Sequence, residues 1–273
     1  MALRASRDAR TMLFVPATRL ERVAKAQASG ADLVIIDLED AVAEADKAEA
    51  RRALADFLEQ ATTPLFVRMN GASTDHFEAD IALCSQADAV HGIMLPKTES
   101  AGDVQRARID GKALWPLVES VRGVINIPHI AACDGIERLT FGALDLSLDL
   151  GAEAGSEGAV TILDQCRAQL ILHSRLNGLA GPVESVEPDF RNTEKVAAVA
   201  LRAAQMGFTG MLCIHPGQIE PVRRAFSPTS EQLEWARRVV DGVAEHGATF
   251  QLDGQMVDEP VIQRARRLIA AAG

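Results

Sequence analysis

Short apolar runs alternate with longer stretches of helical spacing along most of the chain. The runs are rich in Val, Ile, Leu and Phe, which is the length and composition of a buried strand. The stretches between them, for example 18–29, 44–60, 159–177 and 190–206, place apolar side chains at helical spacing among Ala, Glu, Arg and Leu. The eight predicted strands, of which the seventh is the weakest, lie at residues 12–15, 33–37, 65–69, 92–95, 114–118, 139–142, 182–186 and 211–214.

This repeated alternation of strand and helix predicts the fold class. Parallel strands need crossover helices, and eight strand–helix units in succession are sufficient to close a barrel. We therefore predict an α/β protein with a (β/α)8 TIM barrel. The alternative is an open, doubly wound sheet. It is disfavoured because no Gly-x-Gly-x-x-Gly follows the first strand, where a dinucleotide-binding sheet needs it.

No linker, block of like charge or internal repeat divides the chain, so residues 1–273 are expected to form one barrel domain. After the eighth strand the sequence continues with a helical stretch at 231–246 and a tail at 255–272. Because eight units already close the barrel, residues 228–273 are predicted to be a C-terminal helical extension. This extension is expected to pack against the barrel or to form an arm between subunits. The alternative is a lid over the site.

Composition excludes several classes of function. The 28 Lys and Arg residues are outnumbered by 38 Asp and Glu residues, and a net charge of −10 argues against nucleic-acid binding. No apolar run has the length of a membrane span or the pattern of a secretory signal. Four scattered cysteines without a Cys-x-x-Cys pair indicate a reducing compartment. We therefore expect a cytoplasmic protein; the basic residues Arg4, Arg7 and Arg10 leave a mitochondrial presequence as the alternative.

Polar residues follow nearly every predicted strand. The carboxyl ends of the strands carry the active site of a (β/α)8 barrel, so these residues are the candidates for chemistry. Any one of them could equally be a solvated loop residue or a helix cap, but the whole set is not expected to be. The set comprises Asp37, Glu39 and Asp40 after the second strand, Arg68 and Asn70 after the third, Lys97 after the fourth, Glu119 and Ser120 after the fifth, Asp145 after the sixth, and His215 after the eighth.

Glu119 and Asp145 are the predicted metal ligands. They end strands five and six, which are neighbours in a barrel, so their carboxylates can converge. Hard oxygen ligands suit Mg2+, with Mn2+ as the alternative, and both ions leave room for water and substrate. Zinc is disfavoured because the six histidines show no H-x-x-x-H or H-E-x-x-H spacing. The alternative is that these carboxylates form salt bridges with Arg68 or Arg122.

Three further strand-end residues each have two interpretations. Arg68 is a candidate anchor for an acidic substrate, because a guanidinium binds carboxylates through two parallel hydrogen bonds. An ion pair with Asp37 or Glu39 is the alternative, and both can hold at once. Lys97 suggests a Schiff-base lysine, but its place just beyond the strand favours a solvated or carboxylate-paired side chain. His215 is a candidate general base, although a structural hydrogen bond is favoured.

A basic cluster follows the first strand. Arg19, Arg22 and Lys25 fall within two predicted helical turns, near a helix N-terminus. Such a cluster suits the binding of phosphate groups in an otherwise acidic protein. The alternative is a solvated basic helix face.

Eight short motifs follow one another along the chain. They are TMLFVP at 11–16, DLEDAV at 37–42, VRMN at 67–70, LPK at 95–97, LVES at 117–120 followed by Arg122 and Gly123, FGALDL at 141–146, IHPGQ at 214–218 and GQMVDEP at 254–260. In this order, and over essentially the whole chain, they resemble the citrate lyase beta subunit-like acyl-CoA lyases of the HpcH/HpaI aldolase superfamily. The resemblance implies a Mg2+-dependent (β/α)8 lyase, a homotrimer or dimer of trimers, that acts on 3-hydroxyacyl-CoA acids such as malyl-, citramalyl- or citryl-CoA.

The resemblance also implies roles for individual residues, with CoA as part of the substrate. If CoA is bound, Arg19 and Lys25 are the expected contacts for its phosphates. The other implied roles are metal ligation by Glu119 and Asp145, oxoacid binding by Arg68, an acidic pair near the metal-bound waters at Glu39 and Asp40, and acid/base catalysis by Asp258 from the C-terminal segment of a neighbouring subunit.

Two residues depart from the family pattern and leave the acid substrate open. Leu144 stands where many relatives carry an acidic residue, and Gly181 stands where the seventh-strand motif usually contains an aspartate. Three rival functions stay open as well. They are a class II 2-oxoacid aldolase that does not use CoA, a citrate lyase beta subunit that works with an acyl-carrier partner, and a non-catalytic binding protein on the same barrel.

Overall fold

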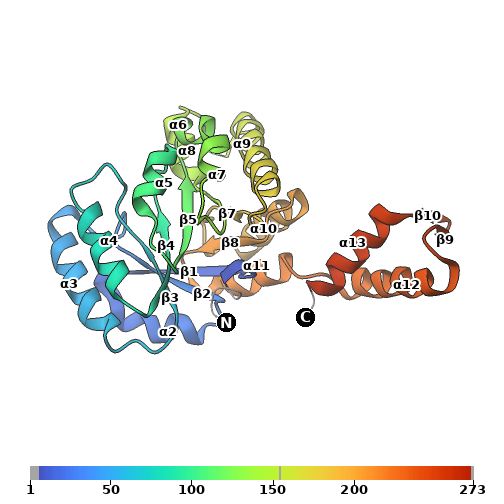
Figure 1. Ribbon diagram of the computed structural model, residues 1–273, viewed down its shortest axis with the longest axis horizontal. Helices are drawn as coiled ribbons and strands as arrows, with labels where there is room; N and C mark the ends of the chain where they lie inside the picture. Colours follow the sequence, from blue (N-terminus) through green and yellow to red (C-terminus); the bar gives the residue numbers. More distant parts are fainter. Residues whose placement is uncertain (1–5, 154, 272–273) are drawn as a thin grey trace. The chain divides into compact units, whose positions relative to one another are not determined.

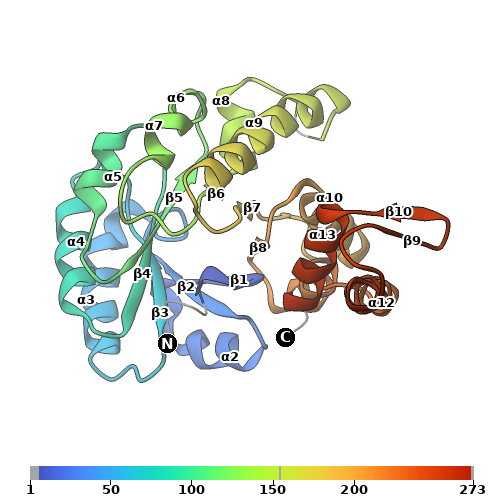
Figure 2. The same cartoon turned by 45° about the vertical axis from the view of Figure 1, so that its right-hand side comes forward.

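Eight parallel strands close a barrel in the computed structural model, which describes residues 6–153 and 155–271 (Figure 1, Figure 2). Each strand pairs with the next, and β8 pairs with β1. The predicted (β/α)8 barrel is confirmed, and every predicted run overlaps a strand. The strands are β1 (Thr11–Pro16), β2 (Leu33–Asp37), β3 (Leu65–Arg68), β4 (Val90–Leu95), β5 (Ala113–Val118), β6 (Thr140–Phe141), β7 (Val183–Glu184) and β8 (Gly210–Cys213).

Helices connect consecutive strands and lie outside the ring of strands (Figure 1). The helix predicted over 18–29 is formed by a 3-10 segment and an α-helix, and it is kinked within the first of these at Arg19, which has non-helical backbone angles, φ −136° and ψ 43°. No helix in the described part of the chain combines the length and apolarity needed to cross a membrane. In chain order the helical segments are η1 (Ala17–Arg22), α2 (Val23–Ala28), η2 (Glu44–Asp46), α3 (Lys47–Leu58), α4 (Phe77–Gln86), α5 (Ala101–Ala107), α6 (Val121–Ile125), α7 (Ile127–Ala131), α8 (Ala143–Asp149), α9 (Glu157–Leu176), α10 (Thr193–Met206), η3 (Pro216–Gln218) and α11 (Ile219–Ala225).

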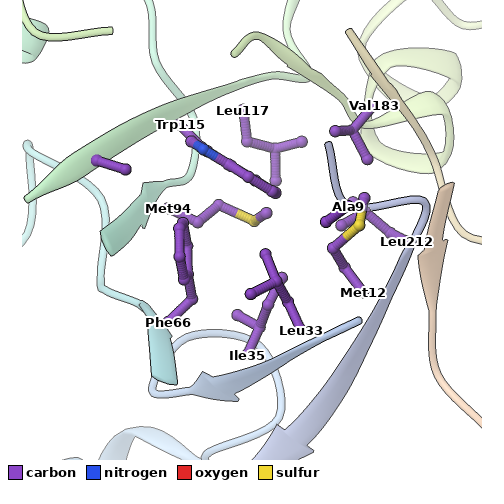
Figure 3. Packing of buried hydrophobic residues seen from close by; sticks show 11 residues of the cluster. Ala9, Met12, Leu33, Ile35, Phe66, Met94, Trp115, Leu117, Val183 and Leu212 are labelled. Carbon is purple, nitrogen blue, oxygen red and sulfur yellow. The ribbon is translucent and has the colours of Figure 1, made fainter. Parts of the chain in front are cut away.

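Alternate residues of the strands fill the barrel interior with apolar side chains (Figure 3). Phe66 and Trp115 pack with their ring centroids 4.7 Å apart and their planes tilted by 55°, an arrangement that aromatic pairs favour. Gly92 in β4 makes room for them, because a side chain there would overlap the Phe66 ring. The barrel is therefore a packed core, and a ligand has space only at its ends.

Arg138 closes the amino-terminal end of the barrel. Its guanidinium is fully buried and lies 5.1 Å from the Trp115 ring centroid. It donates to the carbonyl oxygens of Ser6, Ala9 and Gly181 at 3.2, 2.7 and 2.9 Å and to Oγ1 of Thr209 at 2.7 Å. These acceptors precede β1, β7 and β8, so one side chain fastens the starts of several strands.

The residues from Arg224 onward form a second compact unit. It contains α12 (Ser230–His246), β9 (Phe250–Leu252), β10 (Gln255–Val257) and α13 (Glu259–Ala270). The predicted helix at 231–246 is confirmed, and the tail also contains a helix. The hairpin of β9 and β10 was not predicted. Asp253 and Gly254 form its turn with φ values of 51° and 78°, as a two-residue hairpin requires.

Candidate active site

A cavity of about 430 Å3 opens at the carboxyl ends of the barrel strands. Its apolar floor includes Phe14, Leu117 and Leu212, which belong to or pack against the barrel core. A second cavity, of about 750 Å3, shares three acidic lining residues with the first. The charged residues that line the first cavity are Asp37, Asp40, Arg68, Glu119 and Asp145.

Arg68 is held by a neighbouring carboxylate. Its Nε donates to Oδ1 of Asp37 at 2.7 Å and its Nη2 to Oδ2 at 2.6 Å, because β2 and β3 place the two residues opposite each other. Nη1 lies 3.1 Å from Oε2 of Glu39 and 3.7 Å from Oδ2 of Asp40. Although burial opposes the charged form, these carboxylates raise the pKa of Arg68. The ion pair with Asp37 is therefore present, and it uses two of the five N–H donors.

Lys97 lies beyond β4 and pairs with the acidic residues after β2. Its Nζ donates to Oε1 of Glu39 and lies 3.5 Å from Oδ1 of Asp40. Although burial works against it, the hydrogen bond to Glu39 helps to raise the pKa of Lys97. A protonated, carboxylate-paired lysine does not attack a carbonyl, so the structure favours the paired interpretation over a Schiff base.

Glu39 and Asp40 differ in their electrostatic surroundings. Burial raises the pKa of Glu39, although Arg68 and Lys97 oppose this effect. At Asp40 burial is outweighed by Arg68 and by hydrogen bonds, and its pKa is lowered. Both carboxylates meet cations of the protein, and Asp40 also lines the two cavities.

Glu119 and Asp145 come together beside Arg68. Glu119 directly follows β5, is 5% exposed, and accepts the backbone N–H of Lys97 through Oε1 at 2.8 Å. Burial, followed by the negative charges of Glu39 and Asp145, raises the pKa of Glu119 to about 8. The sequence placed Asp145 at a strand end, which was wrong: β6 stops at Phe141, and Asp145 lies in the first turn of α8. The chain turns at Gly142, so the helix carries this carboxylate to the cavity.

The donor set at Glu119 and Asp145 fits a hard divalent cation. A positive charge there would keep the buried Glu119 carboxylate ionised. Both carboxylates line the same cavity, so the protein offers two ligating side chains there. Within the described ranges no group of three or more His, Cys, Asp and Glu side chains is arranged to hold a metal. Mg2+ is commonly held by one or two carboxylates and fills its other positions with water and substrate oxygens.

The contacts of Arg122 do not match the alternative in which it pairs with Glu119 or Asp145, whereas those of His215 match its structural interpretation. Arg122 lies 3.5 Å from Glu99, so its ion pair is outside the carboxylate pair proposed for the metal. His215 accepts the backbone N–H of Gly217 through Nδ1 at 3.0 Å and stacks on Phe190. The favoured structural hydrogen bond of His215 is therefore present. Asn70 is likewise structural, since its amide groups donate to the buried Asp80.

Arg19, Lys25 and Asp258 are not among the residues that line either cavity at the barrel mouth. Arg19 in η1 and Lys25 in α2 are exposed. Asp258 belongs to the C-terminal unit, where its side chain accepts the backbone N–H of Val261 at 3.4 Å and caps α13.

The sequence analysis missed two residues of the cavity wall. Gly142 lies directly against the side chain of Glu119. Ser185, after β7, accepts the backbone N–H of Ala143 through Oγ at 2.9 Å and so fastens the start of α8. The only sequence signal for Gly142 was a glycine as the last residue of the predicted strand 139–142, and no signal pointed to Ser185.

The closed barrel carries carboxylates and an arginine at the mouth formed by the carboxyl ends of its strands, which is where TIM-barrel enzymes have their active sites. The model of the HpcH/HpaI aldolase/citrate lyase family matches residues 10–216. The chain therefore belongs to this family of aldolases and lyases, as its motifs predicted.

Several relatives cover nearly the whole chain. A citrate lyase subunit beta-like protein of Mycobacterium tuberculosis is 38% identical over 96% of this chain and 94% of its own length. The mitochondrial citramalyl-CoA lyase of Rattus norvegicus is 29% identical over 96% of this chain and 86% of its own length. The crystal structure of the protein CitE from Mycobacterium tuberculosis in complex with magnesium, acetoacetate and coenzyme A has a TM-score of 0.87 at 36% identity and covers 98% of this chain and 99% of that chain.

Proposed function

We propose that this protein is a Mg2+-dependent carbon–carbon lyase that cleaves, or forms, a 3-hydroxyacyl-CoA acid such as malyl-, citramalyl- or citryl-CoA. The products of cleavage are an acyl-CoA and a 2-oxoacid. The observation that carries the proposal is the convergence of Glu119, Asp145 and Arg68 on one cavity at the barrel mouth. The names of the relatives and the magnesium and coenzyme A in the CitE crystal structure support it.

In the proposed mechanism, Mg2+ bound to Glu119 and Asp145 would act as a Lewis acid toward the oxygens of the acid half of the substrate. Arg68 binds the carboxylate of that half with the N–H groups that Asp37 leaves unused, and Asp37 fixes the plane of the guanidinium. Lys97 stays protonated and neutralises part of the charge of Glu39.

Asp258 is proposed as the acid/base. In the condensing direction its carboxylate removes a proton from the methyl carbon of the acyl-CoA, and the alkoxide that forms on the acid half with the new carbon–carbon bond takes up a proton. In the cleavage direction the substrate hydroxyl gives up its proton as the carbon–carbon bond breaks, and the protonated Asp258 delivers a proton to the methyl carbon. The family resemblance implies that Asp258 comes from a neighbouring copy, so we propose a homo-oligomer, a trimer or a hexamer. The four free cysteines among the described residues support a cytoplasmic location.

The lining of the cavity favours an acid half with one carboxylate. Arg68 is the one cation among the described lining residues, against the four carboxylates of Asp37, Asp40, Glu119 and Asp145. The floor at Phe14 and its neighbours is apolar, and an unpaired charge is costly in such surroundings. We therefore propose that glyoxylate or pyruvate is released in preference to oxaloacetate.

Coupled assays of oxoacid release from malyl-, citramalyl- and citryl-CoA test the proposal. We expect release of glyoxylate or pyruvate with free CoA esters as substrates. Turnover of 2-oxoacid aldols with no turnover of any CoA ester would instead indicate a CoA-free class II aldolase. Turnover that appears only with an acyl-carrier protein would indicate a citrate lyase subunit.

A further inference from the structure

The two carboxylate oxygens of Glu119 are in different situations. Oε1 accepts the backbone N–H of Lys97 at 2.8 Å. Within the described part of the chain, no hydrogen bond reaches Oε2. Instead Oε2 lies over Gly142, where an added Cβ would be 2.6 Å from this oxygen and 2.5 Å from the Cβ of Glu119. The carboxylate therefore occupies the space that any side chain at position 142 would need.

The strand register makes this close approach unavoidable. β5 and β6 pair Leu117 with Thr140 and Val118 with Phe141. Glu119 and Gly142 directly follow these two strands, so they are the next residues in the same register. The N–H of Gly142 donates to the carbonyl oxygen of Val118 at 3.0 Å, which keeps the two backbones together. Because the Cβ of Glu119 is fixed to its own backbone, a side chain at 142 could be accommodated only by moving the chains apart.

The opposite side of Glu119 is fixed by β4, the other neighbour of β5. Lys97 follows β4 with a φ of 49°, in the left-handed region that side chains other than glycine seldom adopt. In this conformation its N–H points at Oε1 of Glu119. The segment after β4 thus supplies a hydrogen-bond donor to Glu119. The segment after β6 leaves space for the Glu119 side chain, because Gly142 has no side chain of its own.

A third contact fastens the segment that follows Gly142. Oγ of Ser185 accepts the N–H of Ala143 at 2.9 Å, and Ser185 is itself only 4% exposed. Ala143 is the first residue of α8, and Asp145 lies in the first turn of this helix. The hydroxyl therefore restrains the backbone that carries both Gly142 and Asp145.

We propose that Gly142, the backbone N–H of Lys97 and Ser185 are positioning groups that hold Oε2 of Glu119 and the carboxylate of Asp145 in place for the divalent cation. This inference rests on the metal site of the proposed function. Groups that orient metal ligands typically change metal affinity by about 10- to 100-fold when they are altered. A purely structural role of these groups would change the stability of the fold and leave metal affinity alone.

Metal titration of the full chain separates the two roles. Binding of Mn2+ is measured by electron paramagnetic resonance and calorimetry for Gly142→Ala, and Tm is measured alongside. Gly92→Ala is the matched control, because its added Cβ also overlaps a side chain, the Phe66 ring, but in the barrel core. We expect Gly142→Ala to weaken Mn2+ binding by about 10-fold or more, whereas Gly92→Ala lowers Tm with unchanged affinity. Folded Gly142→Ala with wild-type Mn2+ affinity would overturn the proposal.

Ser185 provides a second variant that removes one hydroxyl and adds no bulk. We expect Ser185→Ala to weaken Mn2+ binding and Ser185→Thr, which keeps the hydroxyl, to restore part of it. If Gly142→Ala does not fold, wild-type affinity in Ser185→Ala overturns the proposal. Failure of the wild-type chain itself to bind Mn2+ or Mg2+ would contradict the metal site of the proposed function. This outcome differs from wild-type affinity in Gly142→Ala or Ser185→Ala, which would overturn only the positioning role.

Discussion

Arg68 makes two kinds of contact with one side chain. Asp37 takes one edge of the guanidinium, and the remaining donors on Nη1 and Nη2 are left for Glu39 and for an acid in the cavity. Lysine keeps the charge but cannot provide the two parallel hydrogen bonds to Asp37.

We therefore expect Arg68→Lys to lower kcat/KM roughly 10- to 150-fold, which corresponds to a loss of about 1.5 to 3 kcal/mol of transition-state stabilisation. The circular dichroism spectrum should stay that of the wild type. Steady-state kinetics on each accepted CoA ester checks the expectation. Kinetics close to wild type on all of them would make Arg68 a purely structural partner of Asp37.

Arg19 and Lys25 are exposed cations close in sequence to the carboxyl end of β1. If they meet the phosphates of CoA, Arg19→Ala and Lys25→Ala should each raise KM for the CoA ester by roughly two- to fivefold, the size of an exposed ion pair. The effect should be larger at low salt, where screening is weaker. Arg175→Ala, an exposed arginine in α9, serves as the control. Equal KM values for all three variants at every salt concentration would remove the phosphate role.

The charged residues of the site were predictable one by one, and so was the ion pair of Arg68 with Asp37, but the particular partner of Lys97 was not. Arg68, Glu119 and Lys97 were predicted as site residues from their positions at strand ends, because a barrel brings the carboxyl ends of all its strands to one face. The pairing of Lys97 with Glu39 depends on side-chain directions across three strands, which no local pattern contains. Gly142 escaped notice for the same reason, since its role depends on the side chain of Glu119 across the sheet.

Among the elements, the starts of the barrel strands depend on Arg138. Its removal takes a charged donor from four oxygens: the carbonyl oxygens of Ser6 and Gly181 keep the N–H of Ala9 and the hydroxyl of Thr209 as donors, whereas the carbonyl oxygen of Ala9 loses its side-chain donor. Hydrogen bonds to a charged group are worth about 1.5 to 3 kcal/mol each, and an unpaired buried acceptor is costly.

Arg138→Met should therefore reduce the free energy of unfolding by about 3 kcal/mol or more, as measured by urea denaturation. Arg108→Met is the control, because Arg108 is half exposed and pairs with the exposed Asp110. We expect a change of less than about 1 kcal/mol for the control. Equal loss in both variants would show that Arg138 has no special role in closing the barrel.

The order of strands and helices was predictable because apolar runs and helical spacing alternate eight times. Three local features of the structure were not predicted from the sequence. The helical segment after β1 is interrupted at Arg19, whose backbone angles are not helical. The strand β6 is only two residues long, so Asp145 is carried by α8 and not by the strand. In the C-terminal unit, the Asp253–Gly254 turn creates a hairpin; Asp-Gly is a known hairpin signal, and the sequence analysis did not use it.

For the whole molecule, the open question is which copy supplies Asp258. The residue caps α13, so Asp258→Asn is the suitable variant: asparagine keeps the cap and removes the charge. Asp258→Asn and Glu119→Gln subunits should each be inactive alone. If Asp258 acts in a neighbouring subunit's site, random 1:1 mixing in a symmetric oligomer should restore about one site in four.

Subunit exchange has to be demonstrated in this experiment, for example with differently tagged chains recovered together. Mixed oligomers that form and stay inactive would contradict the action of Asp258 between subunits. Full activity of Asp258→Asn alone would remove Asp258 from the acid/base role and leave it as a helix cap.

The central claim is that Glu119 and Asp145 hold the metal that makes carbon–carbon cleavage work, and removal of the metal tests it most directly. Wild-type protein treated exhaustively with EDTA should lose oxoacid release from its CoA ester, and Mg2+ or Mn2+ should restore it. Asp145→Ala should have both weak metal binding and a low rate that added metal does not restore. Full activity of the wild-type protein after exhaustive chelation would contradict the account.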